Sequence, residues 1–281
     1  MRLGLVGVDS SHAEDFLRHF NAKQRHNPIR VTALWGGDDD RMTTLVRLSP
    51  EAKPMDSLPA LLANVDAVIV GDRHGGLHRA HAVAALQTGH PVFVDKPLAN
   101  SLDDATAIVD AAERHGVPVS SGSALRWQAE TRRLKAKLAG LDGPIELGAY
   151  GTWYPQNEYG GAIFYAIHTI ELVQELLGVE WSKMRPRAED DLSAVRYRAG
   201  LHTVTLEFRP VSGGSSDFGV EVKAGKIEFR QSIPLSDDYM LPVCDQIAAM
   251  LRNGHGSLTR QELLAPVALM EEIDVLLRVG V

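Results

Sequence analysis

The sequence predicts an α/β protein with a doubly wound parallel sheet over residues 1–122 and a mostly antiparallel sheet over residues 123–281. Up to about residue 122, short apolar runs alternate with helical patterns, which is typical of parallel strands joined by helices. Beyond Gly122-Ser123, short strand candidates follow one another, which indicates antiparallel pairing. These candidates lie at residues 145–153, 192–199, 202–208, 216–223 and 226–231. We therefore expect two domains, divided after residue 122.

Composition excludes several classes of protein. The formal net charge is −7 and no block of Lys and Arg is present, which argues against nucleic-acid binding. No apolar run reaches membrane-spanning length, and the first one meets Asp9 too early for a signal peptide. The single cysteine, Cys244, fits a reducing compartment. We expect a cytoplasmic protein that binds neither nucleic acid nor membranes.

The first strand and its loop resemble a dinucleotide-binding unit. Apolar residues from Leu3 to Val8 precede a helix, for which Ser11 and Glu14 have capping-box spacing. Strand, turn and helix in this order predict that the intervening loop contacts a dinucleotide cofactor. The loop residues that we expect there are Gly7, Asp9, Ser10, Ser11 and His12. Asp9 and His12 replace the second and third glycines of the usual fingerprint, so Asp9 would repel phosphate whereas His12 could donate a hydrogen bond.

The next two strands leave the cofactor type open. The strand at residues 29–35 is followed by Gly36-Gly37, where an acid for the cofactor ribose would stand. The strand at residues 65–70 ends near Asp72, and His78 lies on the helix that follows, so both are candidate cofactor contacts. The spacing of His74, His78 and His81 could hold a metal on a helix, but we expect none because Gly75-Gly76 interrupts that helix. A metal-dependent enzyme that uses Asp9, His12, Asp72 and His74 is an alternative.

The stretch His90–Pro97 carries the main catalytic candidate. Its apolar part predicts a buried parallel strand, which must stop at Lys96 because Pro97 cannot donate a ladder hydrogen bond. Asp95 and Lys96 then stand at the carboxyl end of a central strand, where open α/β sheets bind ligands. A helix from Ser101 to Gly116 and a strand at residues 117–120 complete the first domain.

The second half contains a histidine that is suited to proton transfer. After a basic helix at residues 125–138, the expected elements are the strands above, hairpin turns at Ala199-Gly200 and Ala224-Gly225, and helices at 162–177, 238–252 and 260–278. His168 and Tyr165 lie three residues apart on one helix face, and an imidazole can act as an acid near neutral pH. Trp153 and Asn157 precede this helix and are candidates for shaping a substrate pocket.

Several segments together resemble the glucose–fructose oxidoreductase, inositol dehydrogenase and rhizopine-catabolism (Gfo/Idh/MocA) family. These are Val92–Ala99 with its Asp-Lys-Pro motif, Leu77-His78 and residues 84–89, Ser121–Trp127, and Gly160–Gly178. The resemblance implies a Rossmann domain, an open C-terminal sheet that supports a homo-oligomer, and NAD- or NADP-dependent hydride transfer to or from a sugar, polyol or keto substrate. It also implies a cis Lys96–Pro97 peptide bond, with Lys96 contacting the nicotinamide and the substrate oxygen and His168 as general acid/base.

The resemblance assigns Arg126 to the hinge before the second domain, and we include it among the substrate-binding candidates. Phe164 stands where the family has an aspartate, so Tyr165 is a substitute proton donor. Because the fingerprint is altered, a ligand-binding or sensor protein without turnover is an alternative, as is a nicotinamide-assisted glycosidase. The enzymatic interpretation expects Lys96 and His168 to face one cleft.

Overall fold

The computed structural model describes residues 1–154, 156–187, 194–210 and 217–278, and it forms two compact units. Unit 1 comprises Met1–Gly122 and Met240–Leu263, and unit 2 comprises Ser123–Tyr239 and Leu264–Val281. The first change of unit falls where the sequence places the domain boundary. Met240–Leu263, however, returns to unit 1, although the sequence analysis assigned it to the second domain. Within the described ranges, no helix is long and apolar enough to cross a membrane.

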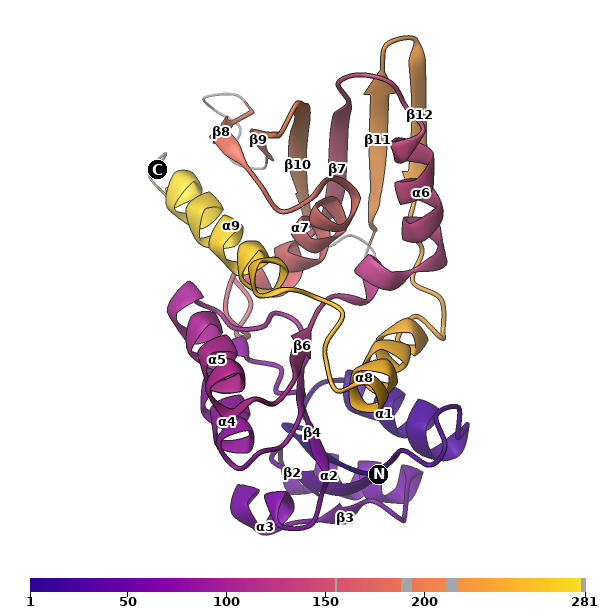
Figure 1. Cartoon of the computed structure of the whole chain (residues 1–281), viewed down its shortest axis with the longest axis vertical. Coiled ribbons are helices and arrows are strands. Elements are labelled where there is room, and N and C mark those ends of the chain that lie inside the picture. The colour runs from indigo at the N-terminus through magenta and orange to yellow at the C-terminus, as the bar shows by residue number, and fades with distance from the viewer. Residues whose placement is uncertain (155, 188–193, 211–216, 279–281) are drawn as a thin grey trace. The chain divides into compact units, whose positions relative to one another are not determined.

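Unit 1 contains the predicted doubly wound parallel sheet (Figure 1). Its strands are β1 (Arg2–Val6), β2 (Arg30–Trp35), β3 (Lys53–Pro54), β4 (Ala67–Val70), β5 (Val92–Val94) and β6 (Val119–Ser121). They are parallel throughout, in the order β3-β2-β1-β4-β5-β6. Every residue of β4 and β5 is buried, which explains why these strands appear in the sequence as unbroken apolar runs.

The helices of unit 1 follow the predicted alternation with the strands. They are α1 (His12–Leu17) with a π-helical continuation at Arg18–Ala22, α2 (Asp39–Leu48), α3 (Leu58–Leu62), a 3₁₀ turn at Gly75–Leu77, α4 (His78–Gln87), α5 (Leu102–His115) and α8 (Leu241–Asn253). Ser101 caps α5 by accepting a hydrogen bond from Asp104 N, and Gly116 ends it with a φ of +64°, as predicted. The capping box at α1 is wrong: Ser11 makes no side-chain cap, and Glu14 instead pairs with Arg41.

Unit 2 contains the second predicted sheet, which is mostly antiparallel. Its strands are β7 (Glu146–Trp153), β8 (Ser182–Pro186), β9 (Ala194–Ala199), β10 (His202–Pro210), β11 (Gly219–Ala224) and β12 (Ile227–Ser232). The order is β12-β11-β7-β10-β9-β8, and only the central β7–β10 pair is parallel among these strands. Gly200 and Gly225, each with a φ of +58°, form the predicted hairpin turns. Residues 192–193 and 216 of the predicted strands lie outside the described residues.

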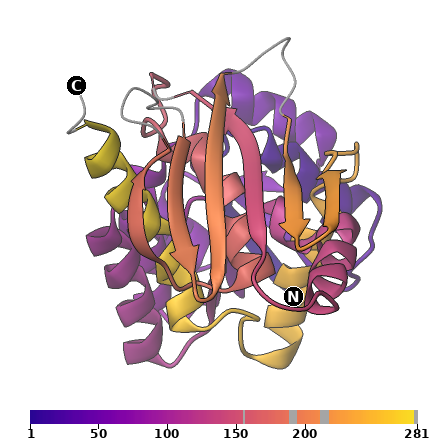
Figure 2. The ribbon, with the colours of Figure 1, turned by 90° about the horizontal axis from the view of Figure 1, so that it is seen from above.

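Helices of unit 2 pack on one face of its sheet. A 3₁₀ turn at Ala124–Trp127 precedes α6 (Ala129–Ala139), and α7 (Ile163–Leu177) packs on β7 and β10. The last described helix, α9 (Arg260–Arg278), belongs to unit 2 from Leu264 onwards. The predicted helix at residues 125–138 is interrupted because Gln128 is extended. Along β10, Val204 and Leu206 are buried whereas Thr203 and Thr205 lie on the other face, over which Figure 2 shows no helix. That face is the open one expected from the resemblance.

Candidate active site

Glycines allow three loops of unit 1 to pack together at the carboxyl ends of β1, β2 and β4. Gly7 has a φ of +73°, and its N–H donates to Trp35 O at 2.9 Å. A Cβ at Gly7 would lie only 2.4 Å from the side chain of Asp72, and one at Gly37 would lie 2.7 Å from Val8 Cγ2. Because the strand order reverses between β1 and β4, these loops meet at the position where doubly wound sheets bind ligands.

The loop from Gly7 to His12 retains donors that suit a phosphate. The amides of His12 and Ala13 donate to the hydroxyl and carbonyl oxygens of Ser10, at 3.3 and 3.1 Å. Among the described residues, by contrast, none accepts a hydrogen bond from the amides of residues 9 to 11. The carboxylate of Asp9 accepts a hydrogen bond from Arg73 N at 3.1 Å. The loop therefore fits the phosphates of a dinucleotide through its backbone, with Asp9 held by the loop after β4.

Arg41, which the sequence analysis did not single out, braces this loop. Its Nε and Nη2 donate to Val8 O and Ser10 O, each at 2.7 Å, and both Nη atoms bond the carboxylate of Glu14. The hydrogen bond to Glu14 raises the pKa of Arg41 above its usual value. All three nitrogens of the guanidinium are thus engaged with protein oxygens. No signal in the sequence spacing connects Arg41 with residues so far away in the chain.

Asp95, His12 and Lys96 form a charged cluster after β5. His12 Nδ1 lies 2.6 Å from Asp95 Oδ2, and Lys96 N donates to Asp95 Oδ1 at 2.9 Å. Both Asp95 and Lys96 are buried. Burial favours the neutral acid, but the charge and hydrogen bond of His12 and the ammonium of Lys96 outweigh it and lower the pKa of Asp95 to about 2. The Lys96–Pro97 peptide bond is cis, as the resemblance implies.

His78 and His81 connect α4 with the strand ends. The ring of His78 has no exposed surface, and its Nε2 and Nδ1 each lie 2.8 Å from a carbonyl oxygen, of Asp72 and of Pro97. His78 therefore links the loops after β4 and β5, and its burial favours a positioning role over contact with a cofactor. His81 Nδ1 lies 2.7 Å from Asp72 Oδ2. In the described ranges, no three His, Cys, Asp or Glu side chains are grouped closely enough to hold a metal ion.

In unit 2, His168 is oriented by a serine that the sequence analysis did not identify. His168 Nδ1 lies 2.7 Å from Ser123 Oγ, which also accepts a hydrogen bond from Leu125 N at 3.2 Å. The N–H of Ser123 donates to Glu171 Oε2 at 2.7 Å, one turn along α7 from the histidine. Ser123 is completely buried. Ser123 and Glu171 therefore provide an orienting group for the imidazole, although Phe164 stands where the resemblance implies an aspartate.

Glu171 and Glu175 hold Arg126, a predicted substrate contact. The guanidinium is buried and lies 3.3 Å from Glu171 Oε2 and 3.1 Å from Glu175 Oε2. Its Nη2 has no hydrogen-bond partner among the described residues. Arg126 thus neutralises two acids next to Ser123 and leaves one guanidinium nitrogen for a further acceptor.

Three other predicted site residues of unit 2 are Tyr165, Trp153 and Asn157, and each makes different contacts. Tyr165 is half-buried, and its ring packs edge-on against Phe164 with centroids 4.8 Å apart. Trp153 stacks obliquely on Phe208, and its buried Nε1 has no partner in the described structure. The side chain of Asn157 bonds three backbone groups of the loop before α7, which indicates a role in shaping that loop.

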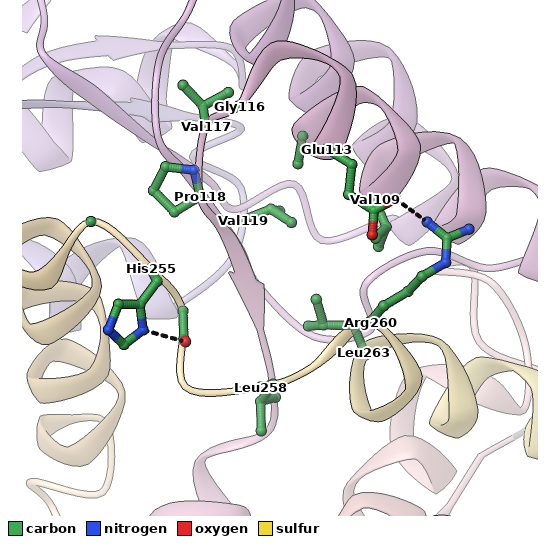
Figure 3. Close-up of a pocket in the computed structure, with 13 residues that line it drawn as sticks. Val109, Glu113, Gly116, Val117, Pro118, Val119, His255, Leu258, Arg260 and Leu263 are labelled. Atoms are coloured by element: carbon green, nitrogen blue, oxygen red, sulfur yellow. Dashed lines mark hydrogen bonds and ion pairs between the residues drawn. The ribbon is translucent and has the colours of Figure 1, made fainter.

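Lys96 belongs to unit 1 and His168 to unit 2, so the expectation that they face one cleft stays a prediction. Unit 1 also has a hollow of about 350 Å³ between α5, the start of β6 and the loop after α8 (Figure 3). Arg260 lies at its rim and pairs with Asp110 and Glu113. Because this hollow adjoins the amino end of β6, it lies away from the loops that fit a cofactor.

Comparisons with known proteins agree with this geometry. Residues 1–123 match the model of the Gfo/Idh/MocA oxidoreductase family with an NAD-binding Rossmann fold. An inositol 2-dehydrogenase/D-chiro-inositol 3-dehydrogenase of Halalkalibacterium halodurans is 30% identical over 116 residues, which cover 41% of this chain and 33% of that protein. The chain spans about a third to a half of the length of the curated relatives that it matches.

Solved structures extend the likeness of fold to the whole chain. The WlbA dehydrogenase of Bordetella pertussis, in complex with NADH and UDP-GlcNAcA, has a TM-score of 0.79 at 18% identity, covering 100% of this chain and 96% of that one. The myo-inositol dehydrogenase of Lactobacillus casei, in complex with NAD(H) and myo-inositol, has a TM-score of 0.76 at 18% identity, with 98% and 94% covered. At these identities the likeness establishes the fold.

Proposed function

We propose that the protein is a nicotinamide-dependent dehydrogenase or reductase of a small sugar, polyol or related keto compound, because residues 1–123 match the model of the Gfo/Idh/MocA oxidoreductase family with its NAD-binding Rossmann fold. The observation that carries the proposal is the position of Lys96 two residues after the end of β5, next to the Asp95–His12 pair, on a sheet of the order β3-β2-β1-β4-β5-β6. This is the edge at which such sheets bind dinucleotides.

In this proposal the loop from Gly7 to His12 holds the phosphates of the cofactor. The amides of Asp9, Ser10 and Ser11 supply the donors, and His12 adds a side-chain donor that Asp95 keeps in place. When bound, the nicotinamide supplies the hydride acceptor or donor. Arg41 is engaged with Glu14 and the loop carbonyls, so it leaves no guanidinium for the additional phosphate of NADP. We therefore propose NAD as the cofactor.

Lys96 is proposed to stabilise the substrate oxygen. Hydride transfer to a carbonyl leaves negative charge on that oxygen, and a preorganised ammonium in a buried position lowers the free energy of this charge. Lys96 is buried, and its backbone N–H donates a hydrogen bond to the Asp95 carboxylate. This bond fixes the backbone at Lys96. Asp72 and His78 are proposed to position the loops around this segment.

His168 is proposed as the general acid/base, with Ser123 as its positioning residue. The Ser123 hydroxyl can donate to Nδ1 or accept from it, because its proton rotates freely about the C–O bond. The imidazole can therefore present Nε2 as an acid or as a base without moving. Tyr165, one turn earlier on α7, is the proposed substitute proton donor.

Trp153, Asn157 and Arg126 define the proposed substrate side of unit 2. Nε1 of Trp153 and Nη2 of Arg126 have no partner among the described residues, but both atoms are buried, so we propose that these side chains shape the substrate side from beneath its surface. Asn157 contributes by holding the loop before α7 in place. We also propose that the protein acts in the cytoplasm as a homo-oligomer, formed through the sheet of unit 2. Light scattering coupled to size-exclusion chromatography tests the oligomer.

Titration of the protein with NADH, followed by nicotinamide fluorescence, tests the cofactor. Saturable binding is expected, and no binding of NADH or NADPH at millimolar concentration would refute the proposal. A screen of sugars and polyols for NADH formation then tests turnover. In Lys96→Met, kcat should fall by a factor of about 100 to 1,000, as for loss of one oxyanion-stabilising donor. The control Lys53→Met, at an exposed lysine of β3, should leave kcat unchanged.

A ligand-binding protein without turnover is the second candidate, and Asp9 and Phe164 at family glycine and aspartate positions favour it. With its altered cofactor loop, it predicts no reaction on any substrate in the screen. It also predicts that Lys96→Met has the same biological activity as the natural chain. Release of sugar without net NADH formation would instead indicate a nicotinamide-assisted glycosidase.

A further inference from the structure

A cluster of cationic side chains lines a second hollow, of about 420 Å³, at the β8–β9 edge of the unit 2 sheet. The cationic residues are Lys183, Arg185, Arg196 and Arg198, and Tyr197 and Thr203 complete the lining. The whole chain carries a net charge of −7, so a concentration of positive charge is not a consequence of its composition. The described residues that line the hollow all belong to unit 2, and none of them is part of the proposed active site.

Repulsion between these positive charges destabilises the β8–β9 edge of the sheet. Arg185 of β8 stands directly opposite Arg196 of β9. Arg198 shares the face of Arg196, because the alternate residues of β9 are buried. Like charges in directly opposite positions destabilise a pair of strands. Among the described residues, the one carboxylate paired with the cluster is Glu146, at 4.0 Å from Arg196, and neither Lys183 nor Arg185 has a hydrogen bond or ion pair.

The backbone at this edge is also irregular. The pairing of β8 with β9 shifts register between Ser182 and Arg185, which is the mark of a β-bulge. Inside the bulge, Lys183 has a φ of +55°, a conformation that residues other than glycine rarely adopt. Bulges redirect side chains, and sparsely populated backbone conformations concentrate at ligand-binding sites. Here the bulge directs a lysine to the hollow that the three arginines line.

Arg198 is held in place before any ligand arrives. Its Nη1 donates to Thr203 Oγ1 at 2.8 Å, and its Nη2 donates to Leu201 O at 2.6 Å. These two bonds fix the plane of the guanidinium and leave further N–H groups to donate. A fixed guanidinium binds a tetrahedral oxyanion with less loss of side-chain entropy than a mobile one.

We propose that this hollow is a binding site for a phosphate group, either free or carried by a small sugar-sized molecule. Arginine forks form charge-assisted, bidentate bonds with phosphate oxygens, and lysine adds a point charge. The volume of about 420 Å³ lies within the range of small-molecule sites. A bound dianion would also remove the repulsion between Arg185 and Arg196.

Isothermal titration calorimetry with inorganic phosphate and with a hexose phosphate tests the site, using chloride at equal ionic strength as the blank. Both anions should bind to the natural chain. Tighter binding of the hexose phosphate would identify a phosphorylated sugar as the ligand, and equal binding would identify phosphate itself. Arg185→Gln and Arg196→Gln should each weaken binding about tenfold, which is the usual effect of losing one charged hydrogen-bond partner.

The matched control is Arg230→Gln on β12, where the arginine pairs with Glu221 and is largely exposed. This variant should bind both anions as the natural chain does. Without ligand, Arg185→Gln should raise Tm by about 1–3 °C because it removes a like-charge pair, whereas phosphate should stabilise it less than it stabilises the natural chain. Anion binding that equals the chloride blank, or that Arg185→Gln and Arg196→Gln leave unchanged, would overturn the proposal.

NADH titrations of the same samples keep this proposal separate from the proposed enzymatic function, because the β8–β9 variants should bind NADH normally. Their oligomeric state should also be that of the natural chain. A change of oligomeric state in Arg185→Gln, with phosphate binding intact, would assign the cluster to a contact between copies of this chain and overturn the phosphate site.

Discussion

Replacing Asp95 with asparagine tests the charged cluster after β5. In the folded protein, His12 and Lys96 lower the pKa of Asp95 to about 2, compared with about 3.9 for an unfolded chain. A carboxyl group with a lowered pKa stabilises the fold at pH values above the unfolded pKa, and this contribution is lost as the pH falls towards the folded pKa. The difference of about two pKa units corresponds to about 2–3 kcal/mol at neutral pH, of which about half is lost by about pH 3.

The measurement is the free energy of unfolding by urea between about pH 7 and pH 3, for the natural chain and for Asp95→Asn. Asparagine has no ionisable carboxyl group, so the contribution of its side chain to the free energy of unfolding should not depend on pH. The difference in unfolding free energy between the two proteins should therefore fall by about 1 kcal/mol between about pH 5 and pH 3. Asp66→Asn is the control, because Asp66 pairs with Arg2 at an exposed site where an ion pair contributes only about 0–1 kcal/mol.

A pH-independent difference for Asp95→Asn would refute the reasoning. It would mean that His12 and Lys96 do not hold the buried carboxyl in its charged form. The proposed orientation of His12 towards the phosphates would then lose its physical basis.

Three further predictions follow from the loops and the hydrogen bonds of the site. Ser123→Ala should lower kcat about 10–100-fold and shift the pH profile of kcat/KM, with the Kd for NADH unchanged; an unaltered pH profile would remove Ser123 as a positioning residue. In urea unfolding, Gly7→Ala should lower the free energy of unfolding by about 2–4 kcal/mol, because its Cβ would clash with Asp72. The control Gly89→Ala should lower it by only about 1 kcal/mol, because Gly89 has a φ of +82° but open space around it. NADH should bind at least about tenfold more tightly than NADPH, because Arg41 is engaged with the loop; equal dissociation constants in the fluorescence titration would contradict this.

The sequence predicts those elements of the fold that local patterns encode. The buried runs of β4 and β5 have no polar residue, and Ser101 and Gly116 occupy their cap positions as their chemistry requires. β8 was missed because it is an edge strand of mostly exposed residues, SKMRP, with no apolar alternation. Its identity as a strand depends on pairing with β9, which a local pattern does not encode.

The site is less predictable because its contacts join distant parts of the chain. The capping box at Ser11 fails because Glu14 binds Arg41, which lies 27 residues further along. The hydrogen bond between His168 and Ser123 spans 45 residues, and neither residue signals the other. A sequence can therefore nominate His168 as a proton carrier, whereas the group that orients it becomes visible only after folding.

The path of the chain has a consequence for how the protein can be divided or truncated. It passes from one unit to the other three times, after residues 122, 239 and 263. The apolar face of α8 is buried in unit 1, where this helix packs on the turn at Arg18–Ala22, yet it is synthesised only after most of unit 2. A polypeptide ending at Tyr239 would thus leave that π-helical segment uncovered, so unit 1 is complete only after residue 263 has been synthesised.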